Sequence, residues 1–131
     1  MAARRSRLSR SSDFQRIYRQ GSSVASRFLV VYWFRRPPEV TAEGPRLGLS
    51  VSKKLGGAVV RNRVKRRLRE AFAAAAPRLA GDHDVVVIAR QPLVDLVERE
   101  AAGEKGLVAA ALEELLRRAG LLADEAGTEQ A

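Results

Sequence analysis

Apolar residues recur with helical spacing in three segments of the chain. In the first, Phe14, Ile17 and Tyr18 stand at i, i+3 and i+4, which places them on one face of a helix. The second segment stops at Pro77, and the third stops at Gly120, a residue type that often follows the last turn of a helix. The pattern therefore predicts helices over residues 11–20, about 60–76 and 107–119.

Three other segments have the character of β-strands. Residues 24–34 are rich in β-branched and aromatic side chains, and residues 46–53 alternate apolar with small or polar positions. We expect these two strands to pair as a hairpin. Residues 84–89 form a nearly continuous apolar run, which predicts a central strand covered on both faces. The order αββαβα predicts an α/β domain with helices packed on a small mixed sheet.

Composition excludes several classes of site. The 131 residues suffice for one domain with a real core. The absence of cysteine excludes disulfides and thiolate metal sites, and a single histidine excludes a multi-histidine site within one chain. There is no apolar run of 18 residues and no signal-peptide pattern, so we expect a cytoplasmic protein with no membrane partner.

The charge of the chain is strongly basic and unevenly placed. Lys and Arg number 24 against 15 Asp and Glu, a net charge of +9, and 20 of the cations are arginine. Residues 1–72 hold 18 basic and 4 acidic side chains, whereas residues 73–131 hold 6 basic and 11 acidic ones. Because arginine pairs with phosphate through two parallel hydrogen bonds, this asymmetry indicates a polyanion-binding face. The alternative is a solvated basic surface.

The predicted helix from about residue 60 divides into three faces. When its residues are placed around a helix at 100° each, they form one apolar stripe and two basic arcs. The stripe is Val64, Leu68, Ala71, Phe72 and Ala75; one arc is Asn62, Lys65, Arg66 and Arg69; the other is Arg63 and Arg67. Like charges at i, i+4 each cost a few tenths of a kcal/mol, and only Arg66 with Glu70 makes a favourable pair at that spacing. A bound polyanion would offset these costs.

Three stretches of the sequence resemble the protein component of bacterial ribonuclease P. They are K-K-x-G-x-A-V-x-R-N-R-x-K-R-x-x-R-E over residues 53–70 with R-x-G-L-S-V-S before it, S-x-D-F-Q-x-I-Y-x-x-G-S-S-V-A-S-R-F over 11–28, and D-V-V-V-I-A-R-Q-P over 84–92. The resemblance covers about residues 7–119. It implies an α/β sandwich with a mixed four-stranded sheet and an unusual left-handed βαβ crossover. A bend within residues 24–34 would supply the fourth strand, and the acidic stretch 98–106 looks longer than is usual for the family.

The resemblance also implies a function and a set of site residues. Family members assist a catalytic RNA, the partner subunit, that removes the 5′ leader of precursor tRNA, with Mg²⁺ held through the RNA. We expect no cofactor or metal bound by the protein itself and no obligate protein partner. The positions that match the RNA-facing residues of the family are Lys53, Lys54, Arg61, Asn62, Arg63, Lys65, Arg66 and Arg69. Those that match the cleft for the precursor-tRNA leader are Phe14, Tyr18 and Tyr32, whose rings suit stacking on unpaired bases. For Phe14, ordinary core packing is an equal alternative.

No residue set in the sequence suits protein-borne catalysis. His83 lies between Asp82 and Asp84, but neighbours entering a strand point to opposite faces and rarely converge on one metal ion. We therefore expect no catalytic residues and no metal ligands in the chain.

Two other function classes stay open from the residues alone. One is a structural RNA-binding protein of ribosomal-protein type, without a role in cleavage, which would have no need of the aromatic positions. The other is a DNA-binding regulator, which lacks support because strands flank the basic helix and no helix-turn-helix is evident. We expect a basic flexible arm over 1–10, one RNA-binding domain over 11–120 and a flexible tail over 121–131.

Overall fold

The chain folds around one mixed sheet of four strands. The computed structural model describes residues 11–37, 44–79 and 81–122. The strand order is β1-β2-β4-β3; β2 runs antiparallel to both of its neighbours, β1 and β4, whereas β3 runs parallel to β4. The strands are β1 (Ser22–Ala25), β2 (Leu29–Arg35), β3 (Arg46–Ser50) and β4 (His83–Ala89).

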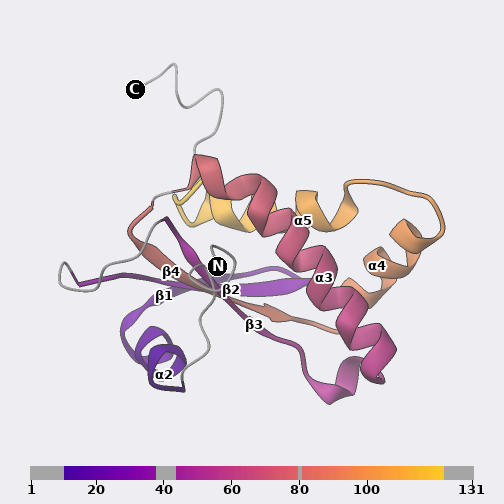
Figure 1. Cartoon of the computed structure of the whole chain (residues 1–131), viewed down its shortest axis with the longest axis horizontal. Helices are drawn as coiled ribbons and strands as arrows, with labels where there is room; N and C mark the ends of the chain where they lie inside the picture. The colour runs from indigo at the N-terminus through magenta and orange to yellow at the C-terminus, as the bar shows by residue number, and fades with distance from the viewer. Residues whose placement is uncertain (1–10, 38–43, 80, 123–131) are drawn as a thin grey trace.

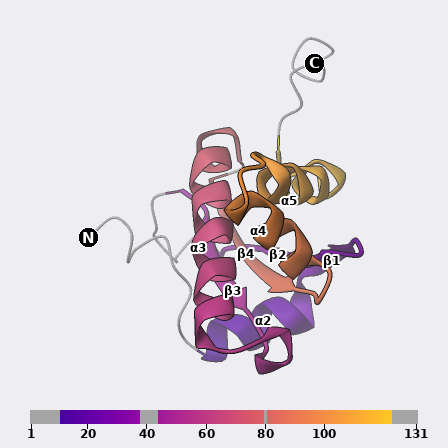
Figure 2. The ribbon, with the colours of Figure 1, turned by 90° about the vertical axis from the view of Figure 1, so that its right-hand side faces the viewer.

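Helices cover the two faces of the sheet unequally. Helix α2 lies alone on one face, and α3, α4 and α5 lie together on the other (Figure 1). Both α4 and α5 contact α3 and each other (Figure 2). The helices are α2 (Ser11–Gln20), α3 (Ala58–Ala75), α4 (Leu93–Ala101) and α5 (Leu107–Arg118), with 3₁₀ turns at Lys53–Leu55 and Ala76–Arg78.

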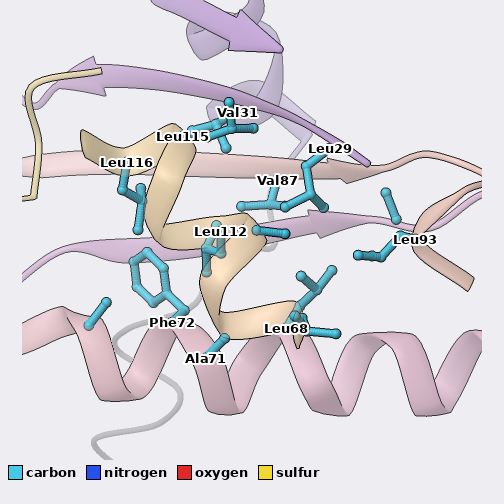
Figure 3. Close-up of a cluster of buried hydrophobic side chains, with 14 of the residues drawn as sticks. Leu29, Val31, Leu68, Ala71, Phe72, Val87, Leu93, Leu112, Leu115 and Leu116 are labelled. Carbon is cyan, nitrogen blue, oxygen red and sulfur yellow. The ribbon is translucent and has the colours of Figure 1, made fainter. Parts of the chain in front are cut away.

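The main core lies between the sheet and the three-helix layer. Leu112, Leu115 and Leu116 of α5 point between α3 and the strands, where they meet Phe72 and Val31 among others (Figure 3). A second, smaller cluster lies on the α2 face around the fully buried Ile17 and Val86. Strand β4 contributes alternate residues to each cluster, so the prediction of a central strand covered on both faces is confirmed.

The segment predicted as one strand over 24–34 is split into β1 and β2. The side chain of Ser26 accepts hydrogen bonds from the backbone N–H groups of Phe28 and Leu29, at 3.1 and 3.3 Å, and so fixes the bend between them. This bend supplies the fourth strand that the family resemblance implies. An α/β fold with a mixed four-stranded sheet is thereby confirmed.

The predicted hairpin between the strands at 24–34 and 46–53 is wrong. Strand β2 pairs with β1 and β4, and β3 pairs with β4 instead. The reason is that β4, the most apolar strand, takes the centre of the sheet and separates the two. The parallel pair β3 and β4 is connected through α3, which gives the βαβ unit that the resemblance implies; its left hand stays a prediction.

The predicted helices are present, and one further helix was not foreseen. Helices α2, α3 and α5 begin and end within two residues of their predicted bounds. Helix α4 follows Pro92 directly, so the expected order αββαβα becomes αβββαβαα. It extends into the stretch 98–106 that looked unusually long, covering residues 98–101, while α5 begins at Leu107 as expected.

The predicted flexible ends of the chain are described only at residues 121 and 122. Leu121 and Leu122, which we expected to begin a flexible tail, are buried, and Leu122 pairs with Leu79 in an isolated β-bridge. The predicted arm over 1–10 and the remainder of the predicted tail lie outside the described residues.

Candidate nucleic-acid interface

Helix α3 buries the apolar stripe that its sequence predicts. Its buried residues are Val64, Leu68, Ala71, Phe72 and Ala75, the five that the helical rotation selects. Because this stripe packs against α5 and the sheet, the rotation of α3 about its axis is fixed, and with it the direction of both basic arcs. One arc faces away from the helical layer, and the other faces α4.

The outward arc is exposed and carries unneutralised positive charge. Asn62, Arg66 and Arg69 are exposed, and Lys65 is half-buried. Within the described part of the chain, neither Lys65 nor Arg66 has a carboxylate partner. At Lys65 and Arg66 the arc therefore presents positive charge that no carboxylate of the described residues neutralises.

A tight turn brings two further lysines to the start of this helix. Ser52 accepts a hydrogen bond from the backbone N–H of Lys54 at 3.1 Å, which fixes the 3₁₀ turn that exposes Lys53 and Lys54. Gly56 leaves the turn with φ of 148°, and a Cβ there would press on Val60 at 3.0 Å. The turn thus requires glycine at this position.

The positive end of α3 adjoins this turn. Gly57 at the N-cap makes no side-chain hydrogen bond, and the first turn of the helix holds no acidic residue. The partial positive charge of the helix N-terminus therefore adds to the positive charges of the two lysines. Arg61 extends this basic region; its Nε donates to the carbonyl of Gly56 at 3.2 Å.

The second basic arc of α3 faces acidic residues of α4. Arg63 Nη1 lies 3.4 Å from both carboxylate oxygens of Glu98, and Arg67 Nε lies 3.6 Å from Glu100 Oε1. Glu70 lies 4.0 Å from Arg67, and not against Arg66 as its i, i+4 spacing indicated. Of the eight predicted RNA-facing residues, Arg63 is the one that the structure pairs with an acid of α4.

Three aromatic rings meet on the opposite face of the sheet. The rings of Phe14 and Tyr18 on α2 have centroids 6.4 Å apart, and Tyr18 meets Tyr32 of β2 edge to face at 5.0 Å. The structure thus brings together all three residues that the sequence assigned to one cleft. Tyr18 is 41% exposed, and partial burial beside Tyr32 raises the pKa of its hydroxyl above the ordinary value.

The aromatic group rests on an apolar base. Phe14 and Tyr32 pack against the buried pair Ile17 and Val86. Phe14 is therefore part of a small core, as its alternative interpretation held, and it also borders the exposed ring of Tyr18.

A buried ionic cluster that sequence reasoning missed holds α2 on this face. Asp84 on β4 is fully buried and accepts hydrogen bonds from Arg36 Nη1 at 2.9 Å and from Arg46 Nε and Nη2 at 2.8 and 2.7 Å. Arg16 of α2 lies 3.6 Å from Asp84, 3.1 Å from Asp13, and over the ring of Phe34 at 5.5 Å. The available signal was an aspartate beginning an otherwise apolar strand, in a chain rich in arginine.

His83 and the two aspartates that flank it in sequence do not form one cluster. Asp82 pairs with Arg35 at 2.7 Å and lies 3.0 Å from His83 Nδ1, whereas Asp84 faces its arginines. Across residues 11–37, 44–79 and 81–122 no three His, Asp or Glu side chains are grouped as metal ligands would be. No helix in the same ranges is long and apolar enough to cross a membrane.

Comparison with known proteins gives concordant matches by sequence and by structure. The model of the Ribonuclease P family matches residues 2–119. A "Ribonuclease P protein component" of Bacillus pumilus is 41% identical over 97 residues, which cover 74% of this chain and 79% of that protein. The same-named protein of Staphylococcus epidermidis is 49% identical over 90 residues, covering 69% of this chain and 75% of that one.

Solved structures match over a larger share of the chain. The RNase P protein of Staphylococcus aureus superposes with a TM-score of 0.74 at 41% identity, covering 89% of this chain and 97% of that one. The RNase P protein of Thermotoga maritima gives a TM-score of 0.68 at 30% identity, covering 85% and 96% of the two chains.

Proposed function

The chain belongs to the ribonuclease P protein family, and from that premise we propose that it binds the catalytic RNA of ribonuclease P and the 5′ leader of precursor tRNA. Membership makes it a subunit of a tRNA-processing endoribonuclease that associates with an RNA subunit. The proposal assigns these two RNA contacts to different parts of the molecule, the basic helix α3 and the aromatic group on the α2 face.

The observation that carries the proposal is the surplus of unpaired cations in the turn before α3 and along the first half of this helix. Lys53, Lys54 and Arg66 are exposed, and no carboxylate of the described chain lies against them. Elsewhere arginines of the same chain do pair with acids, as Arg35 does with Asp82 and Arg99 with Glu104. Cations left without acids beside a helix N-terminus suit the phosphates of a folded RNA.

The aromatic group supports binding of an unpaired strand. Tyr18 exposes part of a ring that Tyr32 holds edge to face, so a base could stack on it without reorganising the protein. Stacking of this kind is tolerant of sequence, which suits a leader that differs from one precursor tRNA to the next.

Catalysis in this proposal belongs to the RNA partner. Most carboxylates of the described chain lie against its own arginines, as Asp13 does with Arg16 and Glu113 with Arg78, and they are not grouped for metal binding. Magnesium ions would be held by RNA phosphates, and the cations of α3 would reduce repulsion between the RNA strands that approach there. A cytoplasmic location follows from where precursor tRNA is made.

Isolation of the RNA attached to this protein in cells tests the proposal. Recovery of one structured RNA together with precursor tRNA is the expected result. Recovery of ribosomal RNA alone would favour the alternative, a structural RNA-binding protein of ribosomal type without a role in cleavage. Recovery of no RNA would contradict both.

A further inference from the structure

Helix α4 presents two glutamates to one face of the basic helix. Glu98 and Glu100 lie against Arg63 and Arg67, which are one helical turn apart on α3. Each arginine has a different acid as its partner, so α4 neutralises the whole of the second basic arc. The contact between α3 and α4 thereby separates the cations of α3 into an outward set and a set paired with acids of α4.

The two ion pairs differ in how firmly they are held. The Glu98 side chain is 50% exposed, and Arg63 reaches its two oxygens at the same long distance of 3.4 Å. The Glu100 side chain is 7% exposed, and its second oxygen accepts a hydrogen bond of 2.9 Å from the backbone N–H of Val108 in the first turn of α5. Glu100 is therefore built into the packing of three helices, whereas Glu98 has only its exposed partner.

We propose that the carboxylate of Glu98 competes with RNA phosphate for the side chain of Arg63. In the free protein Arg63 pairs with Glu98, and when RNA binds, a phosphate replaces Glu98 as its partner. The proposal rests on the proposed function, because it concerns RNA binding by α3. Arg67 is as exposed as Arg63, at 31%, but its partner Glu100 is buried, so Arg67 stays paired within the protein and takes no phosphate. The acidic helix thus sets how many cations of α3 are available to the RNA.

The geometry of Arg63 suits such an exchange. Its side chain is 31% exposed, and helical rotation places it between Arg66 of the outward arc and Arg67, so a rotation of the side chain turns the guanidinium toward that arc. An exposed ion pair contributes little to stability, and a phosphate that offers two oxygens replaces it readily. The competitor acts as a threshold, because a ligand must displace Glu98 before it gains this contact.

A double-mutant cycle on Glu98 and Arg63 tests the inference. The dissociation constant of the cognate RNA subunit is measured for the wild type, Glu98→Gln, Arg63→Gln and the double variant, with thermal melts to verify folding. Removing the competitor should tighten binding about two- to fivefold, the range that corresponds to an exposed ion pair. In the Arg63→Gln background the same change should have no effect, because nothing remains to be released.

Glu104→Gln is the matched control, since Glu104 follows α4 and pairs with Arg99 instead of α3. It should leave the dissociation constant within a factor of about 1.5, which would separate local competition from a general gain of positive charge. Equal tightening by Glu98→Gln with or without Arg63 would overturn the inference, as would no tightening in a protein that binds the RNA. Failure of the wild type to bind the RNA would instead remove the proposed function and the inference with it.

Discussion

Arg46 donates two hydrogen bonds to the buried carboxylate of Asp84, from Nε to Oδ1 at 2.8 Å and from Nη2 to Oδ2 at 2.7 Å. This pair joins the neighbouring parallel strands β3 and β4 through their side chains. The hydrogen bond to Asp84 raises the pKa of the Arg46 guanidinium, which is protonated in proteins in any case. Arg36 donates a further hydrogen bond to Asp84, and Arg16 connects the same carboxylate to α2, which carries two of the three aromatic site residues.

Asp84→Asn should destabilise the protein by about 3–5 kcal/mol. The change leaves the buried Arg36 and the half-buried Arg46 without their counter-charge, and removing one partner of a buried pair carries a penalty of this size. The free energy of unfolding in urea measures the loss. Asp82→Asn is the control, because its pair with Arg35 is exposed, so this substitution should cost much less stability than Asp84→Asn. Similar, small losses in both variants would show that the cluster does not hold the fold together.

Glu100→Ala should cost more stability than Glu98→Ala, although the two glutamates belong to the same helix. Glu100 is buried and caps the backbone N–H of Val108, so its removal should cost about 1–3 kcal/mol. Glu98 is half exposed, and its removal should cost under about 1 kcal/mol. The free energy of unfolding in denaturant, measured for both variants, tests this prediction. An equal loss of stability in the two would contradict the distinction between the two ion pairs.

Arg66→Gln should weaken binding of the RNA subunit without unfolding the domain. Arg66 is exposed and stands on the outward arc, so its removal deletes a phosphate contact and leaves the apolar stripe untouched. The slope of log K against log salt should fall in magnitude by about one. Lys105→Gln removes the same charge from the loop before α5 and should leave the slope nearly unchanged. A lost thermal transition with an unchanged slope would make Arg66 structural.

Tyr18→Ala should reduce the affinity for precursor tRNA by about 1–3 kcal/mol, because an exposed stacking ring is lost. Mature tRNA, which has no leader, should bind as before. Tyr18→Phe keeps the ring and should behave like the wild type toward both ligands. If the alanine variant loses equal affinity for both, the assignment of the aromatic group to the leader is wrong.

The sequence predicted those features that depend on local periodicity. The apolar stripe of α3 is right in all five residues, because helical rotation alone fixes which side chains share a face. The pairing of strands failed because β2 and β3 are separated by β4, which arrives later in the chain, and no local pattern encodes that neighbour.

Helix α4 and the buried Asp84 cluster were missed for related reasons. Leu93, Leu96 and Val97 have helical spacing, but the segment is short and the Pro at its start suggested only a break. Asp84 was predicted only as the first residue of a strand, because its three arginine partners come from α2, from just beyond β2 and from β3. The pairing of Arg63 with Glu98 likewise joins residues 35 apart in sequence. In each case the missing information was tertiary contact.

The magnesium dependence of precursor-tRNA cleavage, measured for the protein alone, the RNA subunit alone and the two together, tests the central claim most directly. The protein's described carboxylates form no metal-binding group, so the protein alone should not cleave at any magnesium concentration. The RNA with the protein should reach full activity at less magnesium than the RNA by itself, because the cations of α3 replace part of the screening. Specific cleavage by rigorously RNA-free protein, or an unchanged magnesium requirement, would contradict the account.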